Sequence, residues 1–365
     1  MTSAALQEYI TKGAQAIVAD AVRAAVQNPR EAAFLARFAL ASRQADGKRL
    51  RHEREGLHVP TFLIASITSA CNLHCAGCYS RAENQTVDCK PVRQLTAGDW
   101  DRVFSEAEEL GVSFILLAGG EPLLRRSVVE KAAGHPGLLF PVFTNGTYLD
   151  ERYLTLFDER RNLLPVISLE GGREKTDGRR GEGVYDILLR NMEAFVRRGI
   201  LWGASVTVTR DNMDEVMSPS FVRKLTGKGC RLFIFVEYVP VTKDSLSLAP
   251  EDEERAWMAE ALNGLRQTHP NTLFLSFPGD EKASDGCLAA GRGFFHINSH
   301  GGAEPCPFSP YSDVNVKEAS LRAAIASGLF QRIRDGGLLL EEHAGGCTLY
   351  ARRAEVEALR GDCTD

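Results

Sequence analysis

The sequence predicts an α/β fold: a partial (β/α)6 TIM-like barrel, with an N-terminal helical segment before it and a small C-terminal α+β extension after it. From Pro60 onward, short apolar runs alternate with amphipathic helical stretches. Continuous apolar runs of this length are typical of parallel strands that helices cover. The six runs are FLIASIT, SFILLAGG, LFPVFTNG, PVISLEGG, LWGASVTVT and RLFIFVEYVP. We expect the boundaries of the three parts at residues 1–58, 59–245 and 246–365.

Composition narrows the class of protein. The chain has 365 residues, of which 44% are hydrophobic and 25% charged, enough to bury a large core. A net charge of -5 gives no basic field for nucleic acid. No apolar run approaches the roughly 18 residues of a membrane helix, and the amphipathic N-terminus lacks the apolar core of a signal peptide. We therefore expect a cytoplasmic protein without a transmembrane segment, whose nine cysteines are metal ligands, catalytic groups or buried thiols.

The segment before the barrel reads as helices with a break at NPRE. Asn28 can cap a helix, and Pro29 suits its first position. Phe34, Leu35 and Phe38 then form an apolar stripe, which predicts packing against the rest of the chain.

Three cysteines follow the first apolar run, in SITSACNLHCAGCYSR, at Cys71, Cys75 and Cys78. Their spacing also fits one face of a helix with buried thiols, but the segment follows a strand and no apolar stripe continues it. Structural zinc usually takes four ligands from paired C-x2-C knuckles. A four-iron cluster held by three thiolates leaves one iron without a protein ligand. The spacing thus favours a [4Fe-4S] cluster with an open coordination position.

This C-x3-C-x2-C motif, GGEP after the second run and six βα units together resemble the radical S-adenosylmethionine (radical SAM) superfamily, over roughly residues 60 to 242. The resemblance implies that the open iron binds the amino and carboxylate groups of S-adenosyl-L-methionine. An electron passed through the cluster would cleave that molecule to methionine and a 5'-deoxyadenosyl radical, which takes hydrogen from a substrate. It also implies a low-potential electron donor such as flavodoxin or ferredoxin.

The GGEP motif has a physical reading beside the family's. Gly119 and Gly120 let the backbone approach a ligand closely, and Pro122 fixes the turn. Exposed carbonyls and the Glu121 carboxylate can receive the methionine ammonium. A tight turn alone would also explain the two glycines.

Other strand ends supply further candidates for binding S-adenosylmethionine. Ser168, and Arg179 or Arg180 in DGRRG, are similar in position to groups that bind the methionine carboxylate in the superfamily. An arginine fork suits a carboxylate, although an exposed arginine is by default a solvated charge. Asn145 and Thr207 are candidates for ribose or substrate contacts, with simple strand capping as the alternative.

One position departs from the superfamily's pattern. Many relatives carry an aromatic residue just before the third cysteine, against the adenine, whereas this chain has Gly77. Tyr79, one position after Cys78, is the expected replacement.

The C-terminal part contains a second cysteine pattern. GFFHINS reads as a strand, HGG as a turn and AEPC as the return, so a hairpin lies between Cys287 and Cys306. This resembles the auxiliary-cluster extension of radical SAM enzymes called SPASM or, at half length, twitch. Cys347 is the expected third ligand, after a returning helix SLRAAIASGLFQRI. The resemblance implies one auxiliary [4Fe-4S] cluster, with buried free thiols as the alternative.

Three cysteines remain outside these patterns. Cys230 precedes the sixth strand and is expected in the core. Cys89 and Cys363 stay open between an inert role, a ligand that closes the auxiliary cluster and a hydrogen-atom donor.

The expected function is that of a radical SAM enzyme, and no residue is assigned as catalytic. We expect a small metabolite or cofactor precursor as substrate, because the sequence leaves no room for a leader-peptide-binding module before the barrel. The alternatives are maturation of a peptide or protein side chain and a non-catalytic iron-sulfur redox or sensor protein. The intact GGEP argues against the last.

Overall fold

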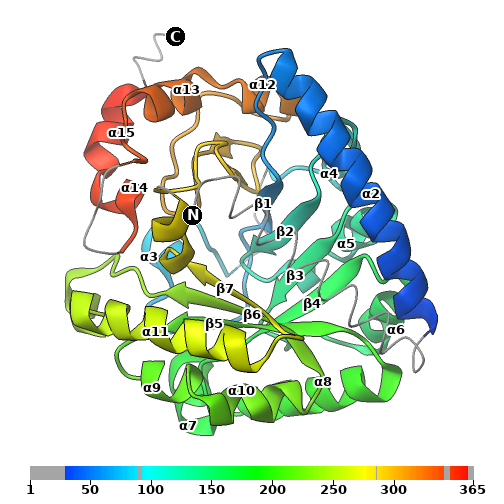
Figure 1. The fold of residues 1–365 in the computed structure, drawn as a ribbon, viewed down its shortest axis with the longest axis vertical. Coiled ribbons are helices and arrows are strands. Elements are labelled where there is room, and N and C mark those ends of the chain that lie inside the picture. The colour runs from blue at the N-terminus through cyan, green and yellow to red at the C-terminus, as the bar shows by residue number, and fades with distance from the viewer. Residues whose placement is uncertain (1–28, 89–92, 285, 341–345, 361–365) are drawn as a thin grey trace.

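The computed structural model describes residues 29–88, 93–284, 286–340 and 346–360, and a nine-stranded sheet forms its centre (Figure 1). The strand order is β7-β6-β5-β4-β3-β2-β1-β8-β9, so the sheet has two edges and is not closed. All neighbouring strands are parallel except β8 and β9. The strands are β1 Phe62–Thr68, β2 Phe114–Gly119, β3 Phe140–Thr144, β4 Leu163–Ser168, β5 Trp202–Val208, β6 Cys230–Glu237, β7 Leu273–Phe277, β8 His296–Ile297 and β9 Ala303–Glu304. The predicted α/β partial barrel is confirmed, since each of the six predicted runs overlaps one strand, with β4 and β6 beginning slightly earlier than expected.

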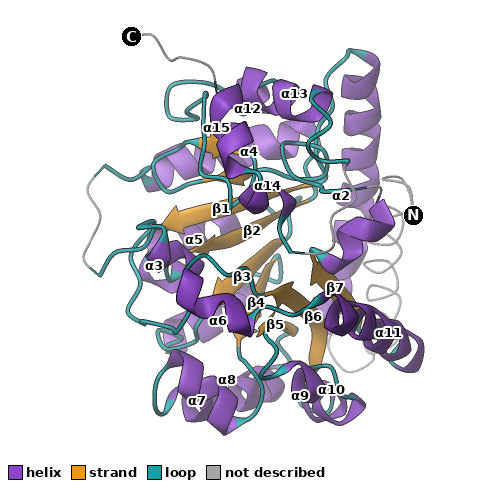
Figure 2. Cartoon of the chain, turned by 90° about the vertical axis from the view of Figure 1, so that its left-hand side faces the viewer, coloured by secondary structure: helices purple, strands orange, loops and turns teal. Residues whose placement is uncertain are grey.

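Helices cover the strands and extend beyond them. The α-helices are α2 Pro29–Arg54, α3 Tyr79–Ala82, α4 Ala97–Leu110, α5 Arg126–Ala133, α6 Glu151–Glu159, α7 Arg173–Arg180, α8 Val184–Arg198, α9 Met213–Val216, α10 Pro219–Thr226, α11 Asp252–Thr268, α12 Leu321–Ile325, α13 Gly328–Asp335, α14 Thr348–Ala351 and α15 Arg353–Leu359. The short 3-10 helices are η1 Pro122–Leu124, η2 Lys243–Leu248 and η3 Gly279–Ser284. Helices α12 to α15 lie at the end of the molecule opposite α7 to α10 (Figures 1 and 2). No helix in the described part of the chain is long and apolar enough to cross a membrane.

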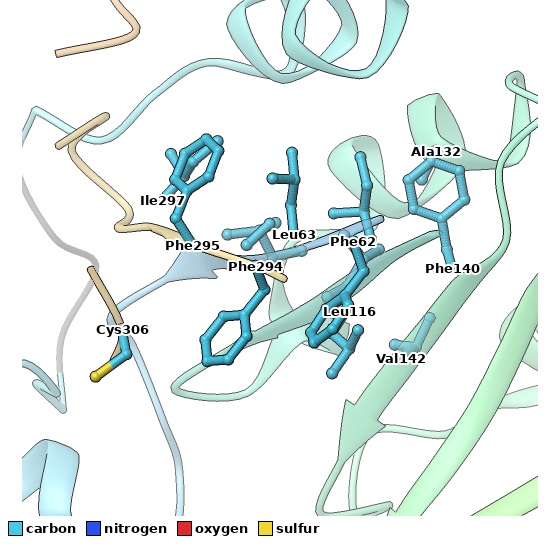
Figure 3. Packing of buried hydrophobic residues seen from close by; sticks show 14 of the residues in the cluster. Phe62, Leu63, Leu116, Ala132, Phe140, Val142, Phe294, Phe295, Ile297 and Cys306 are labelled. Carbon is cyan, nitrogen blue, oxygen red and sulfur yellow. The ribbon is translucent and has the colours of Figure 1, made fainter. Parts of the chain in front are cut away.

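The core explains why the apolar runs become strands. Alternate residues of a strand face opposite sides of the sheet. In β1, Leu63 is fully buried and belongs to the main hydrophobic core. Phe62, its neighbour, stacks on Phe114 of β2 and on Phe294 of the extension, with ring centroids 4.9 and 5.0 Å apart (Figure 3). Both faces of the central strands are therefore buried, which the continuous apolar character predicted.

Strands of the C-terminal part continue both edges of the sheet. Strand β7 pairs in parallel with β6, and β8 pairs in parallel with β1. The predicted hairpin is present as β8 and β9. His296 on β8 joins its two neighbours: its ring nitrogens lie 2.7 Å from Glu304 on β9 and 2.7 Å from the Ser66 hydroxyl on β1. The extension is thus built into the barrel sheet, while its proposed boundary after residue 245 stays a prediction.

Helix α2 packs at the amino ends of the strands. Its described part starts at Pro29, the first described residue, so the predicted break at NPRE stays a prediction, and it buries Phe34, Leu35 and Phe38 beside Leu139. With the strand ends these side chains enclose a cavity of about 130 Å³. Helices predicted before Pro29 lie outside the described residues.

One predicted helix is two helices in the structure. The segment SLRAAIASGLFQRI was expected to be continuous, but it is divided between α12 and α13. Ser327 accepts a hydrogen bond from the Phe330 amide and so caps α13. Asp313 accepts from the Ser327 hydroxyl and from the Leu329 amide, at 2.6 and 2.7 Å. A new helix start is satisfied here by side-chain acceptors, and this favours the break.

Candidate functional site

A cavity of about 350 Å³ lies at the carboxyl ends of the strands, and cysteines of both groups line it. Such clefts are where α/β barrels bind their ligands. Most of the predicted site residues line it: Cys71, Cys75, Cys78, Tyr79, Gly119, Gly120, Asn145, Ser168, Arg179, Arg180, Thr207, Cys287, Cys306 and Cys347. Glu121 and Pro122 are buried behind this wall.

The loop that carries the first three cysteines is fastened at two points. The Cys71 amide donates to the Val87 carbonyl at 3.0 Å. Farther along, the Ala76 amide donates to the Arg179 carbonyl at 2.8 Å, and the Arg179 guanidinium donates back to the Ala76 carbonyl at 3.1 Å. The thiols are partly exposed toward the cavity on a loop whose backbone is held from both sides.

The two glycines of GGEP are required by this loop. A Cβ on Gly119 would stand 2.1 Å from the Thr68 carbonyl oxygen, and one on Gly120 would stand 2.1 Å from that of Ala70. The Gly120 amide donates to the Thr68 carbonyl at 2.7 Å, and the Glu121 amide donates to the Ala70 carbonyl at 2.8 Å. Any side chain here would displace the segment that leads into Cys71.

Glu121 ties the end of β2 to the end of β3. Its carboxylate accepts from the Leu123 amide at 2.9 Å, the Thr144 hydroxyl at 2.7 Å and the Asn145 amide at 2.8 Å. The side chain is 0% exposed, and burial raises its pKa to about 7 against these hydrogen bonds. Gly119 and Gly120 form the part of the motif that faces the cavity. Contact between the carboxylate and an ammonium stays a prediction.

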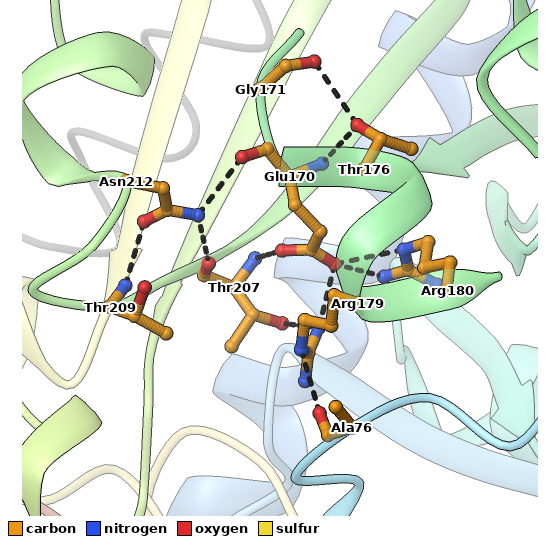
Figure 4. A network of polar contacts seen from close by, with 9 residues as sticks. All are labelled: Ala76, Glu170, Gly171, Thr176, Arg179, Arg180, Thr207, Thr209 and Asn212. Atoms are coloured by element: carbon orange, nitrogen blue, oxygen red, sulfur yellow. Dashed lines mark hydrogen bonds and ion pairs between the residues drawn. The ribbon is translucent and has the colours of Figure 1, made fainter. Parts of the chain in front are cut away.

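Two arginines meet one buried carboxylate on the opposite wall (Figure 4). Glu170 is 1% exposed and accepts from Arg179 Nη1 at 2.6 Å and from Arg180 Nε at 2.8 Å. The Thr207 hydroxyl accepts from Arg179 Nη1 at 2.9 Å, and the Thr207 amide donates to Glu170 at 3.1 Å. Two guanidinium groups against one carboxylate leave a surplus positive charge, which suits an anionic ligand.

The space beside Gly77 is filled by an aromatic ring that the sequence analysis missed. Gly77 has φ +65°, and a Cβ there would lie 2.4 Å from the Tyr238 hydroxyl oxygen. Tyr238 follows β6, is 3% exposed and lines the cavity. Its hydroxyl has no hydrogen-bond partner among the described residues. Tyr79, the expected replacement, lines the same cavity and packs on Phe308, with ring centroids 4.5 Å apart, so its contact with adenine stays a prediction.

The C-terminal cysteines come together from distant parts of the chain. Cys287 and Cys306 are 4% and 5% exposed, and Cys347 is half-buried at the start of α14. A hydrogen bond with Cys347, together with burial, raises the pKa of the Cys306 thiol. Burial, with Glu281 and Cys347 nearby, raises the pKa of the Cys287 thiol. The fold therefore brings the three predicted thiols to one region of the cavity wall.

A fourth side chain beside these thiols was not anticipated. Glu281 in η3 is 7% exposed, lines the cavity and accepts a hydrogen bond from the Cys287 thiol at 3.6 Å. Burial raises the pKa of its carboxyl to about 7. No motif marks this residue in the sequence, since it precedes the first C-terminal cysteine in an acidic, glycine-containing turn.

The donor sets fit iron-sulfur clusters better than single metal ions. In the described ranges, no three Cys, His, Asp or Glu side chains converge closely enough to hold one ion. In a cluster each thiolate binds a different iron, so the sulfurs need not converge. Thiols are also the ligands that such clusters take. Both cysteine groups therefore fit a cluster chemically.

Of the remaining cysteines, the structure describes one. Cys230 is fully buried in the core, and its thiol donates to the Leu232 carbonyl at 3.3 Å, which confirms the expectation for it. Cys89 and Cys363 lie outside the described residues.

Comparisons with known sequences agree with the geometry. Residues 65–218 match the family model described as the radical SAM superfamily. The chain is 25% identical over 338 residues to the AdoMet-dependent heme synthase of Methanosarcina barkeri, covering 84% of this chain and 94% of the relative. It is 27% identical over 329 residues to the mycofactocin maturase MftC of Mycolicibacterium smegmatis, covering 84% and 79%.

Solved structures share the fold. Streptococcus suis SuiB bound to its precursor peptide SuiA superposes with a TM-score of 0.61 at 16% identity, over 80% of this chain and 71% of that one. The enzyme anSMEcpe with bound AdoMet gives a TM-score of 0.57 at 16% identity, over 81% and 95%. At this identity the likeness concerns the fold.

Proposed function

We propose that this chain, whose residues 65–218 match the radical SAM superfamily, is an enzyme of the subgroup with a SPASM- or twitch-type extension and cleaves S-adenosylmethionine reductively. Cys71, Cys75 and Cys78 would hold the [4Fe-4S] cluster for this reaction. When bound, cluster and S-adenosylmethionine supply a 5'-deoxyadenosyl radical, formed with methionine by one-electron cleavage, that takes hydrogen from a substrate. The observation that carries the proposal is that these thiols share a cavity wall with the Gly119–Gly120 backbone and the arginine pair.

The chain's own residues would orient S-adenosylmethionine through charge. Arg179 and Arg180 would bind the methionine carboxylate, supported by their surplus positive charge over Glu170. The backbone at Gly119 and Gly120 would accept from the methionine ammonium, with Glu121 holding that backbone in place. Ser168 and Asn145 line the same cavity and would contact the remaining polar groups.

Tyr238 would contact the nucleoside part of S-adenosylmethionine. Its ring occupies the space that Gly77 leaves beside the second and third cysteines. A buried hydroxyl without a partner costs free energy unless a ligand satisfies it. The combination of this hydroxyl with an aromatic face supports a contact with adenine.

We propose a second, auxiliary [4Fe-4S] cluster at Cys287, Cys306 and Cys347. Support comes from three thiols that meet at one cavity, although they are distant in sequence. The low-potential electron donor would be a flavodoxin or ferredoxin.

The substrate would be a small metabolite or cofactor precursor with an apolar body. The cavity proposed for S-adenosylmethionine also has an apolar part between the two cysteine groups, and clefts of this kind take small molecules. Its apolar lining consists of Ile64, Leu116, Phe143, Ile234, Val236, Phe277, Phe294 and Phe308. The alignment over almost all of a heme synthase supports a substrate of this kind.

A second candidate is maturation of a peptide side chain. The similarity to a mycofactocin maturase and the fold shared with SuiB, which was solved with its precursor peptide, favour it. In that case a single side chain would enter the cavity.

Isotope transfer would test the function and separate the two substrate classes. The protein is reconstituted without oxygen and given S-adenosylmethionine, a strong reductant and an extract of deuterium-grown cells. We expect deuterium in 5'-deoxyadenosine, detected by mass spectrometry, with the small-molecule fraction and not with the peptide fraction. Transfer only from the peptide fraction, abolished by prior protease treatment, would instead support peptide maturation. Absence of 5'-deoxyadenosine under all conditions would refute the enzymatic proposal itself.

A further inference from the structure

We infer that the Glu281 carboxylate is a protein ligand of the auxiliary cluster, bound to the iron that the three C-terminal cysteines leave without a thiolate. This inference rests on the proposed auxiliary cluster and adds a ligand to it. It starts from a buried carboxylate that faces the same cavity as Cys287, Cys306 and Cys347.

A tight turn holds Glu281 next to the first of these thiols. Its carboxylate lies 3.6 Å from the Cys287 sulfur. The Gly286 amide donates to the Glu281 carbonyl at 3.2 Å, and the Cys287 amide donates to the Leu339 carbonyl at 2.8 Å. Gly286 has φ +110°, and a Cβ there would lie 2.0 Å from the Leu339 carbonyl oxygen. The backbone is therefore fixed so that the carboxylate and the thiol share one region of the wall.

Within the residues that the structure describes, Glu281 lacks the basic partner that two other acids of the chain have. Asp280 pairs with Arg266 at 2.8 Å, and Glu170 pairs with two arginines. Among the described residues no ion pair joins Glu281 to a basic side chain. Arg292 acts on it electrostatically, but Arg292 Nη1 donates to the Cys287 carbonyl at 3.1 Å. A buried carboxylate without a basic partner either keeps its proton, as at Glu121, or coordinates a metal. The Cys287 sulfur 3.6 Å away and the shared cavity wall favour the metal for Glu281.

The number of ligands that a four-iron cluster needs also leaves a place for Glu281. Three thiolates bind three irons of a four-iron cluster, and one oxygen ligand from Glu281 completes the set. Carboxylate oxygen is a weaker partner for such iron than thiolate, so this iron would be the one most easily lost. The inference therefore predicts both a direct bond and a lability that a cysteine at the same position would remove.

The direct bond is tested on the reconstituted full chain containing glutamate labelled with ¹³C at the side-chain carboxyl. In the reduced protein, electron-nuclear double resonance should detect ¹³C coupling to an auxiliary-cluster signal. Glu281→Gln should lose the coupling, whereas Asp280→Asn, at the neighbouring acid, should keep it. Repeating the measurement with Cys71, Cys75 and Cys78 all replaced by Ala assigns the coupling to the auxiliary cluster.

Iron retention gives a second readout. After mild oxidation in the presence of a chelator, the auxiliary cluster of Glu281→Ala should fall to about three irons, while that of Glu281→Cys should keep about four, as full thiolate ligation predicts. An auxiliary cluster that binds four irons but shows no ¹³C coupling overturns the assignment of Glu281 alone. A chain that binds no iron at the C-terminal cysteines overturns the auxiliary cluster and this ligand together.

Discussion

The two cysteine groups differ in how the chain assembles them. Cys71, Cys75 and Cys78 belong to one loop and are partly exposed to the cavity. Cys287 and Cys306 flank a hairpin, and both are almost fully buried. Cys347 reaches them from a third segment, before α14. The first group is defined by local sequence, whereas the second requires three separate segments of the C-terminal part to come together.

Because of this difference, we expect the two sites to cost different amounts of conformational entropy to form. Closing a short loop costs little conformational entropy, and the cost increases with the length of chain enclosed. The first group lies within one short loop, which the adjoining glycines, Val87 and Arg179 hold in place. The second depends on the whole C-terminal part, so its cluster and its fold should stabilise each other.

The largest expected effect comes from the first group. Replacing Cys71, Cys75 and Cys78 together by Ala should abolish S-adenosylmethionine cleavage, because among the cysteines that the structure describes these are the ones beside the Gly119–Gly120 backbone. Formation of 5'-deoxyadenosine, measured by chromatography and mass spectrometry, is the readout. The matched control replaces Cys287, Cys306 and Cys347, which should leave detectable cleavage. Unchanged cleavage in the first variant would contradict the assignment of the loop.

The second group of cysteines should bind half of the iron in the reconstituted protein. We expect about eight irons per reconstituted chain and about four after joint replacement of Cys287, Cys306 and Cys347 by Ala, from two four-iron clusters. Cys230→Ala serves as a control for a buried thiol and should keep all eight. A parent chain that binds only four irons would mean that the second group is structural.

Replacing Glu121 alone should have a smaller effect on S-adenosylmethionine binding, although still a large one. Glu121→Ala leaves the amides of Leu123 and Asn145 and the Thr144 hydroxyl without their buried acceptor. Since these bonds hold the Gly119–Gly120 backbone in place, we expect loss of one charge-assisted hydrogen bond to the methionine ammonium, about 1.5–3 kcal/mol, and so roughly tenfold to a hundredfold weaker S-adenosylmethionine binding. Anaerobic equilibrium dialysis measures it, with the exposed Glu130→Ala as control. Binding at parental strength would exclude a role for this carboxylate in orienting the ligand.

Tyr238→Phe should have a more modest effect that separates two aromatic candidates. Loss of one neutral hydrogen bond costs about 0.5–1.5 kcal/mol, so S-adenosylmethionine should bind roughly two- to tenfold more weakly. Tyr79→Phe should bind it normally, because that ring packs on Phe308. The reverse result would return the adenine contact to Tyr79, as the sequence alone had suggested.

The last expected effect concerns stability instead of ligand binding, and it is a dependence on pH. Burial raises the pKa of Glu121 from 4.5 to about 7, so the folded protein keeps this proton while the unfolded chain releases it. The stabilisation is complete below pH 4.5 and is lost as pH rises to 7, at up to about 1.4 kcal/mol per pH unit. Melting temperatures between pH 5 and 8 should therefore fall less steeply in Glu121→Gln. Equal slopes in parent and variant would contradict the raised pKa.

The features that could be predicted depend on residues that are close together in the sequence. The three-cysteine loop, the glycines that contact it and the six parallel strands all follow from neighbouring residues in the sequence. The C-terminal hairpin followed from turn chemistry at HGG, as β8 and β9 confirm. The break at Ser327 was missed because its second acceptor, Asp313, lies on a separate segment.

The features that could not be predicted depend on contacts between residues that are distant in the sequence. Tyr238 could not be linked to Gly77, because only the fold brings the end of β6 against the cysteine loop. Glu281 carries no motif, and its burial beside Cys287 depends on the turn at Gly286. The parallel pairing of β7 with β6 likewise depends on the arrangement of the whole sheet.

The His296 bridge has a consequence for how such extensions can be exchanged. Its imidazole joins Glu304 within the extension to Ser66 in the middle of the first barrel strand. Grafting the C-terminal part onto another barrel would leave a buried imidazole nitrogen without its hydroxyl, unless that barrel also carried a serine at the matching position of its first strand. In this chain the extension is therefore not an interchangeable module, and a chimera should transfer Ser66 together with everything from β8 onward.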